Sequence, residues 1–107
     1  MPAIIIYCTV PNKNEAKEIS KAILERKLAA CISTVDKVDS MFSWNGKICN
    51  ERELLLIIKT KRELFNQIET VIKELHSYNV PEIIGLPIVA GSEDYLGWID
   101  HETKSTN

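Results

Sequence analysis

A tight β-hairpin is predicted near the middle of the chain by the stretch Phe42-Ser43-Trp44-Asn45-Gly46-Lys47-Ile48. Asn-Gly is the strongest two-residue hairpin signal, because a type I′ turn needs a positive φ at both central positions. Residues 29–44 before and within this stretch predict a long, irregular strand. The chain returns through a second strand that ends in five consecutive apolar residues, 54–58.

A predicted helix and a further strand lie on each side of this hairpin. Upstream, residues 3–9 predict a strand, and Asn12 with Glu15 three residues later predicts the capped start of a helix. Downstream, Thr-Lys-Arg-Glu at 60–63 predicts a second capping box that opens a second helix. Residues 83–90 predict the last strand, bulged or at a sheet edge because Pro87 cannot donate to a ladder. Ser92 is the predicted cap of a short final helix.

This β-α-β-β-α-β order, followed by a short helix, predicts a ferredoxin-like α+β sandwich with one long hairpin. The chain has 107 residues, so we expect a single domain over 1–107, with 102–107 as a disordered tail. Both long helices would cover one face of the sheet, yet residues 4–6 and 54–58 are apolar at every position. Something must therefore cover the second face, which predicts a closed oligomer.

Composition excludes several classes of partner. The formal net charge is -2, so no bulk electrostatic field attracts nucleic acid. Apolar runs are far too short to span a membrane. The odd number of cysteines and the apparent lack of a secretion signal predict reduced thiols and a cytoplasmic location.

No nucleophile motif, Walker loop or dinucleotide fingerprint is present in the sequence, so we do not predict an enzyme. Metal binding is a more specific hypothesis than catalysis, because thiolate and imidazole groups are suitable ligands for copper or zinc. The possible donors are scattered, so any site must be assembled in space: Met1, Cys8, Cys31, Met41, Cys49, His76 and His101. Each also has a structural interpretation, such as core packing for Cys8 and a helix C-terminus for His76.

Motifs spread over nearly the whole chain carry a resemblance to a known family. They are Cys8-Thr9-x-Pro11, Leu28-Ala29-Ala30-Cys31, Ser40-x-Phe42-x-Trp44-x-Gly46-x-Ile48, Glu53, Ile58-Lys59-Thr60, His76-x-Tyr78-x-Val80-Pro81-Glu82-Ile83, Leu86-Pro87-Ile88 and Tyr95-Leu96-x-Trp98. In this order and spacing they resemble the CutA family of divalent-cation tolerance proteins.

The resemblance implies a ferredoxin-like subunit in a homotrimer that binds copper or another divalent cation in metal-ion homeostasis, with no cofactor required for folding. It places the metal ligands at Cys8 and His76. Two departures matter: Ser77 follows His76 where the family has proline, and Leu75 stands where a second histidine can occur. A third departure, Phe42 in place of tyrosine, removes a hydroxyl from the hairpin.

Two other functions stay open. The first is a trimeric signalling or scaffold protein, like the PII proteins whose trimer architecture resembles that of the CutA family. It would bind a small ligand or partner in a cleft between subunits, near Trp44, Glu53, Lys59, Tyr78, Glu82 and Trp98. A lysine with flanking carboxylates and aromatic walls would hold a polar metabolite there. A hydrolase on an acylphosphatase-like topology rests on fold analogy alone, and no arginine lies in a phosphate-cradling loop near the first strand.

Overall fold

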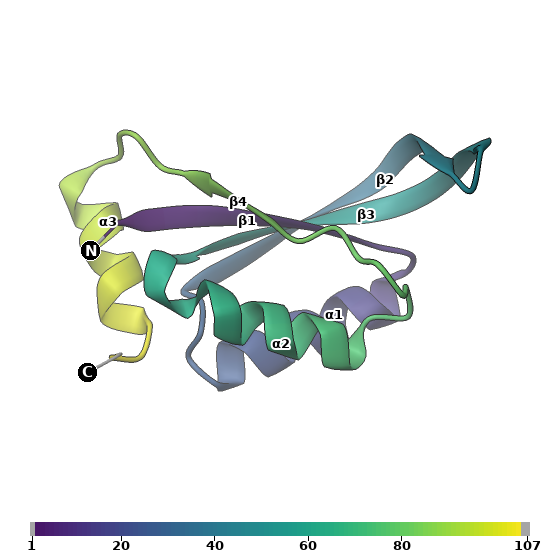
Figure 1. Cartoon of the computed structure of the whole chain (residues 1–107). Helices are drawn as coiled ribbons and strands as arrows, with labels where there is room; N and C mark the ends of the chain where they lie inside the picture. Colours follow the sequence, from purple (N-terminus) through teal and green to yellow (C-terminus); the bar gives the residue numbers. More distant parts are fainter. Residues whose placement is uncertain (1, 106–107) are drawn as a thin grey trace.

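The structure is a computed structural model that describes residues 2–105. Its elements in order are β1 (Ala3–Val10), α1 (Lys13–Glu25), β2 (Cys31–Trp44), β3 (Lys47–Lys61), the 3₁₀ turn η1 (Arg62–Leu64), α2 (Phe65–Leu75), β4 (Ile84–Pro87) and α3 (Glu93–Glu102). One four-stranded sheet has the order β2-β3-β1-β4, and every neighbouring pair is antiparallel. The predicted ferredoxin-like α+β fold is confirmed (Figure 1).

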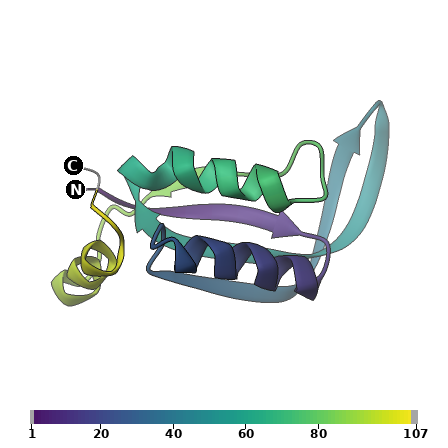
Figure 2. The ribbon, with the colours of Figure 1, turned by 90° about the horizontal axis from the view of Figure 1, so that it is seen from below.

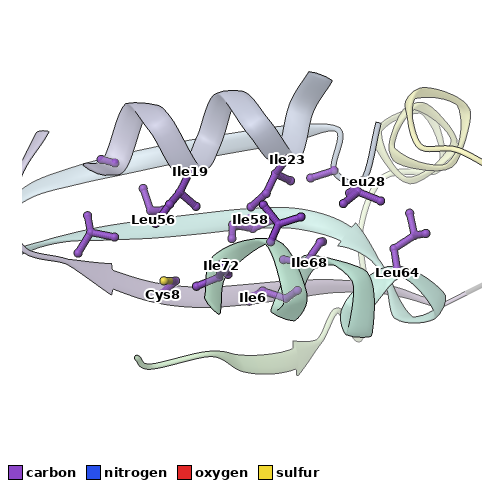
Figure 3. Close-up of a cluster of buried hydrophobic side chains, with 14 of the residues drawn as sticks. Ile6, Cys8, Ile19, Ile23, Leu28, Leu56, Ile58, Leu64, Ile68 and Ile72 are labelled. Atoms are coloured by element: carbon purple, nitrogen blue, oxygen red, sulfur yellow. The ribbon is translucent and has the colours of Figure 1, made fainter. Parts of the chain in front are cut away.

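The two long helices lie side by side on one face of the sheet, as Figures 1 and 2 show from two directions. Alternate residues of β1 point into this layer, and the side chains of Ile4, Ile6, Cys8 and Val10 are buried there. Ile19 of α1 and Ile72 of α2 close over them, and neither is exposed at all (Figure 3). This layer is the one hydrophobic core of the described chain.

The other face of the sheet carries the second set of apolar side chains. Ile5 and Tyr7 of β1 lie opposite Lys59 and Ile57 of β3, and all four are half-buried. Figure 1 shows no helix along this face, since α3 sits at one end of the sheet. The strands are therefore apolar on both faces, as the sequence indicated, within a single described chain.

The central hairpin has the predicted turn. Asn45 has a φ of 52° and Gly46 a φ of 76°, the left-handed pair that a type I′ turn needs. The predicted irregularity of β2 is a register shift between Val35 and Val38, where Lys37 has a φ of 60°. Beyond this bulge the two strands leave the rest of the sheet and extend past the helices (Figure 1).

The two predicted capping boxes differ in outcome. The side chain of Asn12 accepts a hydrogen bond of 2.8 Å from the Glu15 N–H, so the first cap is confirmed. The second is wrong, because Thr60 stays in β3 and is fully buried. Its hydroxyl donates to the carbonyl of Leu28 at 2.5 Å, a buried acceptor that competes with the helix N-terminus.

The last strand is shorter than expected, and the final helix has the predicted cap. β4 has only four residues, Ile84–Pro87, and forms a sheet edge, as its proline predicted. Ser92 caps α3 by accepting from the Tyr95 N–H at 3.2 Å. Glu102 ends that helix and Thr103 is buried, so the helix reaches the start of the segment 102–107 that the sequence predicts as a tail. Thr106 and Asn107 lie outside the described residues. Among residues 2–105, no helix has the length and hydropathy needed to cross a membrane.

Candidate functional site

Cys8 lies near the end of β1, in the core beneath the helices. Its side chain is completely buried (Figure 3), and its Sγ is 3.8 Å from the Thr9 carbonyl oxygen. Burial raises the pKa of the Cys8 thiol from an ordinary 9.0 to about 12, and the charges of Glu82, Glu15 and Glu53 add to the rise. A metal that binds this sulfur must first displace a tightly held proton, which costs about a thousandfold in affinity relative to an ordinary thiol.

His76 follows α2 directly, and its ring is fully buried. Nε2 lies 2.7 Å from the Thr9 carbonyl oxygen, and the Tyr78 N–H donates to Nδ1 at 3.0 Å. These two bonds fit the neutral ring with its proton on Nε2. The Glu15 carboxylate, 3.3 Å from Nδ1, instead accepts from the N–H and hydroxyl of Ser77, each at 3.1 Å.

The fold therefore brings Cys8 and His76 to the same carbonyl, that of Thr9, but does not present them as metal ligands. The thiol is protonated and buried, and both imidazole nitrogens already have hydrogen-bond partners. Within residues 2–105, no three His, Cys, Asp or Glu side chains are grouped so that they could hold a metal ion. The residues present do not fit a preformed copper centre.

A cleft of about 670 Å³ opens beside this point, between the segment 78–82 and the outer part of the hairpin, from Glu53 to Trp44 beside the turn. Four of the six predicted cleft residues line it: Trp44, Glu53, Tyr78 and Glu82. The remaining lining residues are Thr9, Ser40, Met41, Phe42, Cys49, Glu51, Asn79 and Val80. None of these twelve residues is a lysine or an arginine.

The cleft is strongly anionic. Glu53 is only 4% exposed, and its Oε2 accepts a 2.7 Å hydrogen bond from the Tyr78 hydroxyl. Burial and this bond raise the pKa of Tyr78. Desolvation, with the charge of Glu53, also raises the pKa of Glu82. No lysine or arginine in the described chain forms an ion pair with Glu51, Glu53 or Glu82.

Lys59 and Trp98, the other two predicted cleft residues, lie elsewhere. Lys59 Nζ donates to Ser33 Oγ at 2.5 Å and lies 3.6 Å from Cys31 Sγ, on the sheet face that carries no long helix. The Trp98 ring packs against Tyr95 of α3 in a tilted arrangement, with ring centroids 5.6 Å apart. α3 sits at the end of the sheet opposite the hairpin tip (Figure 1), so the six residues can meet only if a second copy brings the two ends together.

Two contributors to the site were missed by the sequence reasoning. Glu15, which was predicted only as part of a helix cap, bonds to Ser77 beside His76. Glu51, which was not predicted at any site, lines the cleft. Glu51 carried a usable signal. It is two residues from Glu53 in a strand, so both side chains share one face.

Fold and cleft together define a ferredoxin-like α+β domain with an uncompensated anionic cleft along a long hairpin. The model of the family described as CutA1 divalent ion tolerance protein matches residues 4–102. The chain belongs to this family, as its sequence motifs predicted.

Individual relatives agree over nearly the full chain. The Protein CutA, chloroplastic, of Arabidopsis thaliana is 40% identical over 98% of this chain, which spans 58% of that relative's length. The crystal structure of CutA1 from Oryza sativa superimposes with a TM-score of 0.95 at 40% identity, covering 99% of this chain and 97% of that one. The divalent cation tolerance protein CutA of Archaeoglobus fulgidus has a TM-score of 0.92 at 39% identity, with 95% and 99% covered.

These relatives overturn the predicted cytoplasmic location. The Arabidopsis protein is named chloroplastic, and the Archaeoglobus protein is described as periplasmic. All three cysteines are free thiols, as predicted, but free thiols and a modest net charge occur in several compartments. The number of cysteines therefore does not identify the compartment of this protein.

Proposed function

We propose that this protein binds divalent cations and acts in metal-ion tolerance, as a binding protein and not as an enzyme. One observation supports this most: three carboxylates, Glu51, Glu53 and Glu82, line one cleft to which no basic residue contributes. Carboxylate oxygens are ligands for hard divalent cations, and an unpaired group of them attracts cations from solution. Since no set of three donors is preformed among residues 2–105, the ion would enter partly hydrated and bind weakly.

We also propose a specific ion and specific ligands, namely copper bound by Cys8 and His76. It requires the Cys8 thiol to lose its proton and His76 to give up one of its two hydrogen bonds. The neighbouring negative charges oppose thiolate formation until a cation arrives, and a bound cation reverses that effect. Copper binding at this pair would then depend on a local opening around Thr9.

We further propose that the working form is a homotrimer. Support comes from the apolar second face of the sheet, where Val35, Ile84 and Leu86 are 43%, 50% and 37% exposed. The resemblance to the CutA family gives the subunit number. Sedimentation equilibrium at micromolar concentration is expected to give three times the 12.1 kDa chain mass, and a single chain mass would refute it.

Competition titration with a chelator of known affinity tests the metal proposal. Cu(II), Zn(II) and Mn(II) would be titrated into wild type, into the Glu53→Gln/Glu82→Gln variant and into the Cys8→Ser/His76→Ala variant. We expect the carboxylate variant to bind every ion about tenfold more weakly or worse. Unchanged affinities in that variant would refute the cleft as the cation site. Loss of copper binding alone in the second variant would support Cys8 and His76 as ligands.

A second candidate function, a PII-like role in binding a small ligand or partner, is favoured by the size and walls of the cleft. Its volume of about 670 Å³ lies in the range of small-molecule sites, and its lining includes Phe42, Trp44 and Tyr78. The sequence predicted a polar metabolite held by Lys59. Within one chain Lys59 does not line this cleft, so that prediction of the ligand does not apply to the cleft of a single chain. Thermal stabilisation by a small molecule in the absence of metals would support this role.

A further inference from the structure

Glu53 is a buried carboxylate that has no counter-ion within the part of the chain that the structure describes. Its side chain lines the cleft, and the residue as a whole is only 4% exposed, so few water molecules can hydrate the carboxylate. Oε2 accepts from the Tyr78 hydroxyl, which is the hydrogen bond that the carboxylate makes within residues 2–105. Oε1 is not fully enclosed by protein, so it remains open to the cleft that the residue lines. Burying a charge with a single neutral donor is unfavourable, because a hydroxyl only partly replaces the lost hydration. A cation placed in the cleft would supply the missing partner.

The walls of the cleft indicate which kind of cation this is. Phe42 and Trp44 line it with rings that remain 40% and 49% exposed. Met41 and Val80 add apolar surface, and both are largely exposed in the single chain. Aromatic faces attract cations, most strongly when the cation carries little hydration. A hydrated metal ion gains little from such walls, whereas an organic cation gains from the walls and from the carboxylate together.

We propose that the cleft binds an organic cation, an alkylammonium or guanidinium group. Its charge lies against Glu53, and its apolar part lies against Phe42 and Trp44. The inference rests on the second candidate function and names its ligand class. The cation has two possible sources, a free small molecule or a basic side chain from a second copy of this chain. Lys59 is the candidate for the second source, because it has no carboxylate partner in the described chain and lies outside its own cleft.

Tryptophan fluorescence tests the proposal directly. The chain has two tryptophans, so a Trp98→Phe background leaves Trp44 as the only reporter, inside the cleft. This protein is titrated with n-butylammonium, with n-butanol as the neutral analogue and with n-butyrate as the anion. We expect a saturable change with n-butylammonium only. Equal responses to n-butylammonium and n-butanol would overturn the proposal, because charge would then contribute nothing.

Matched variants locate the cation. Glu53→Gln is expected to weaken n-butylammonium binding about tenfold or more, since it removes a nearby unit charge in a poorly hydrated site. Glu18→Gln changes an exposed glutamate on α1 and is expected to leave the affinity unchanged. Equal weakening in both variants would overturn the assignment to Glu53.

A Lys59→Gln variant distinguishes the two possible sources of the cation, because n-butylammonium binding is measured with and without this lysine. Binding to the protein with Lys59 intact indicates a cleft open to a free molecule. Binding only after Lys59→Gln indicates that a second copy's lysine fills the cleft in the assembly. Absence of binding in both proteins overturns the proposal. The metal titration is independent of this result, so a cleft that rejects organic cations but binds Mn(II) would leave the divalent-cation proposal standing.

Discussion

Replacing Cys8 with alanine is expected to change how the stability of the protein depends on alkaline pH. The Cys8 thiol is completely buried, and its pKa is raised from 9.0 to about 12. Above about pH 9 the thiol ionises in the unfolded chain but stays protonated in the folded one. The unfolded state then binds fewer protons, so the free energy of unfolding falls as the pH rises, up to about pH 12.

The magnitude follows from these two values. At about pH 10 the unfolded thiol is one unit above its pKa, which lowers the free energy of unfolding by about 1.4 kcal/mol. The full shift of three units would give about 4 kcal/mol, reached only near pH 12. The cavity left by Cys8→Ala has its own cost, but that cost is the same at every pH and cancels in the comparison.

The assay is urea unfolding of wild type and Cys8→Ala under reducing conditions, at about pH 7 and about pH 10. Wild type should lose about 1.4 kcal/mol more than the variant between the two conditions. Cys49→Ala, which removes a thiol from the hairpin, controls for thiol loss as such. Equal losses in wild type and Cys8→Ala would refute the reasoning, because the thiol would then ionise as readily in the folded protein as in the unfolded one.

Three further predictions concern single side chains. Thr60→Val leaves the Leu28 carbonyl without its donor and should cost about 1–3 kcal/mol by urea unfolding, while Thr70→Val, whose hydroxyl bonds at the surface, should cost less; equal costs would contradict the role of burial. Asn12→Ala removes the α1 cap and should cost about 1 kcal/mol, and an unchanged midpoint would argue against that cap. Glu82→Gln should stabilise the protein more at neutral than at acid pH, because the raised pKa marks an ionised form that folding disfavours; a pH-independent difference would contradict this.

Elements of the fold could be predicted from the sequence wherever a local sequence signal agrees with the tertiary structure. Asn45-Gly46 fixes the hairpin because few other residues adopt its backbone angles, and Pro87 places its strand at an edge. Thr60 misled the reasoning because a capping box and a buried strand end share the same residue types. Only the distant Leu28 carbonyl, which sequence spacing does not locate, decides between them.

The site was accessible only in part. Trp44, Glu53, Tyr78 and Glu82 do come together in one cleft, but Lys59 and Trp98 do not. The reason is register: Lys59 pairs with Ile5 near the start of β1, whereas the cleft adjoins Thr9 near its end. The hydrogen bonds of the His76 ring could not be predicted either, since nothing in the sequence indicates that both of its nitrogens already have partners.

The most direct test of the cation-binding proposal is paramagnetic broadening of amide NMR signals by Mn(II). Substoichiometric Mn(II) is added to the isotopically labelled protein, and Glu53→Gln/Glu82→Gln serves as the matched variant. The proposal predicts early broadening at Thr9, Glu53 and Tyr78 in wild type, and its loss in the variant. Broadening that is no stronger there than at exposed glutamates such as Glu18, or that persists in the variant, would contradict a cation site in the cleft.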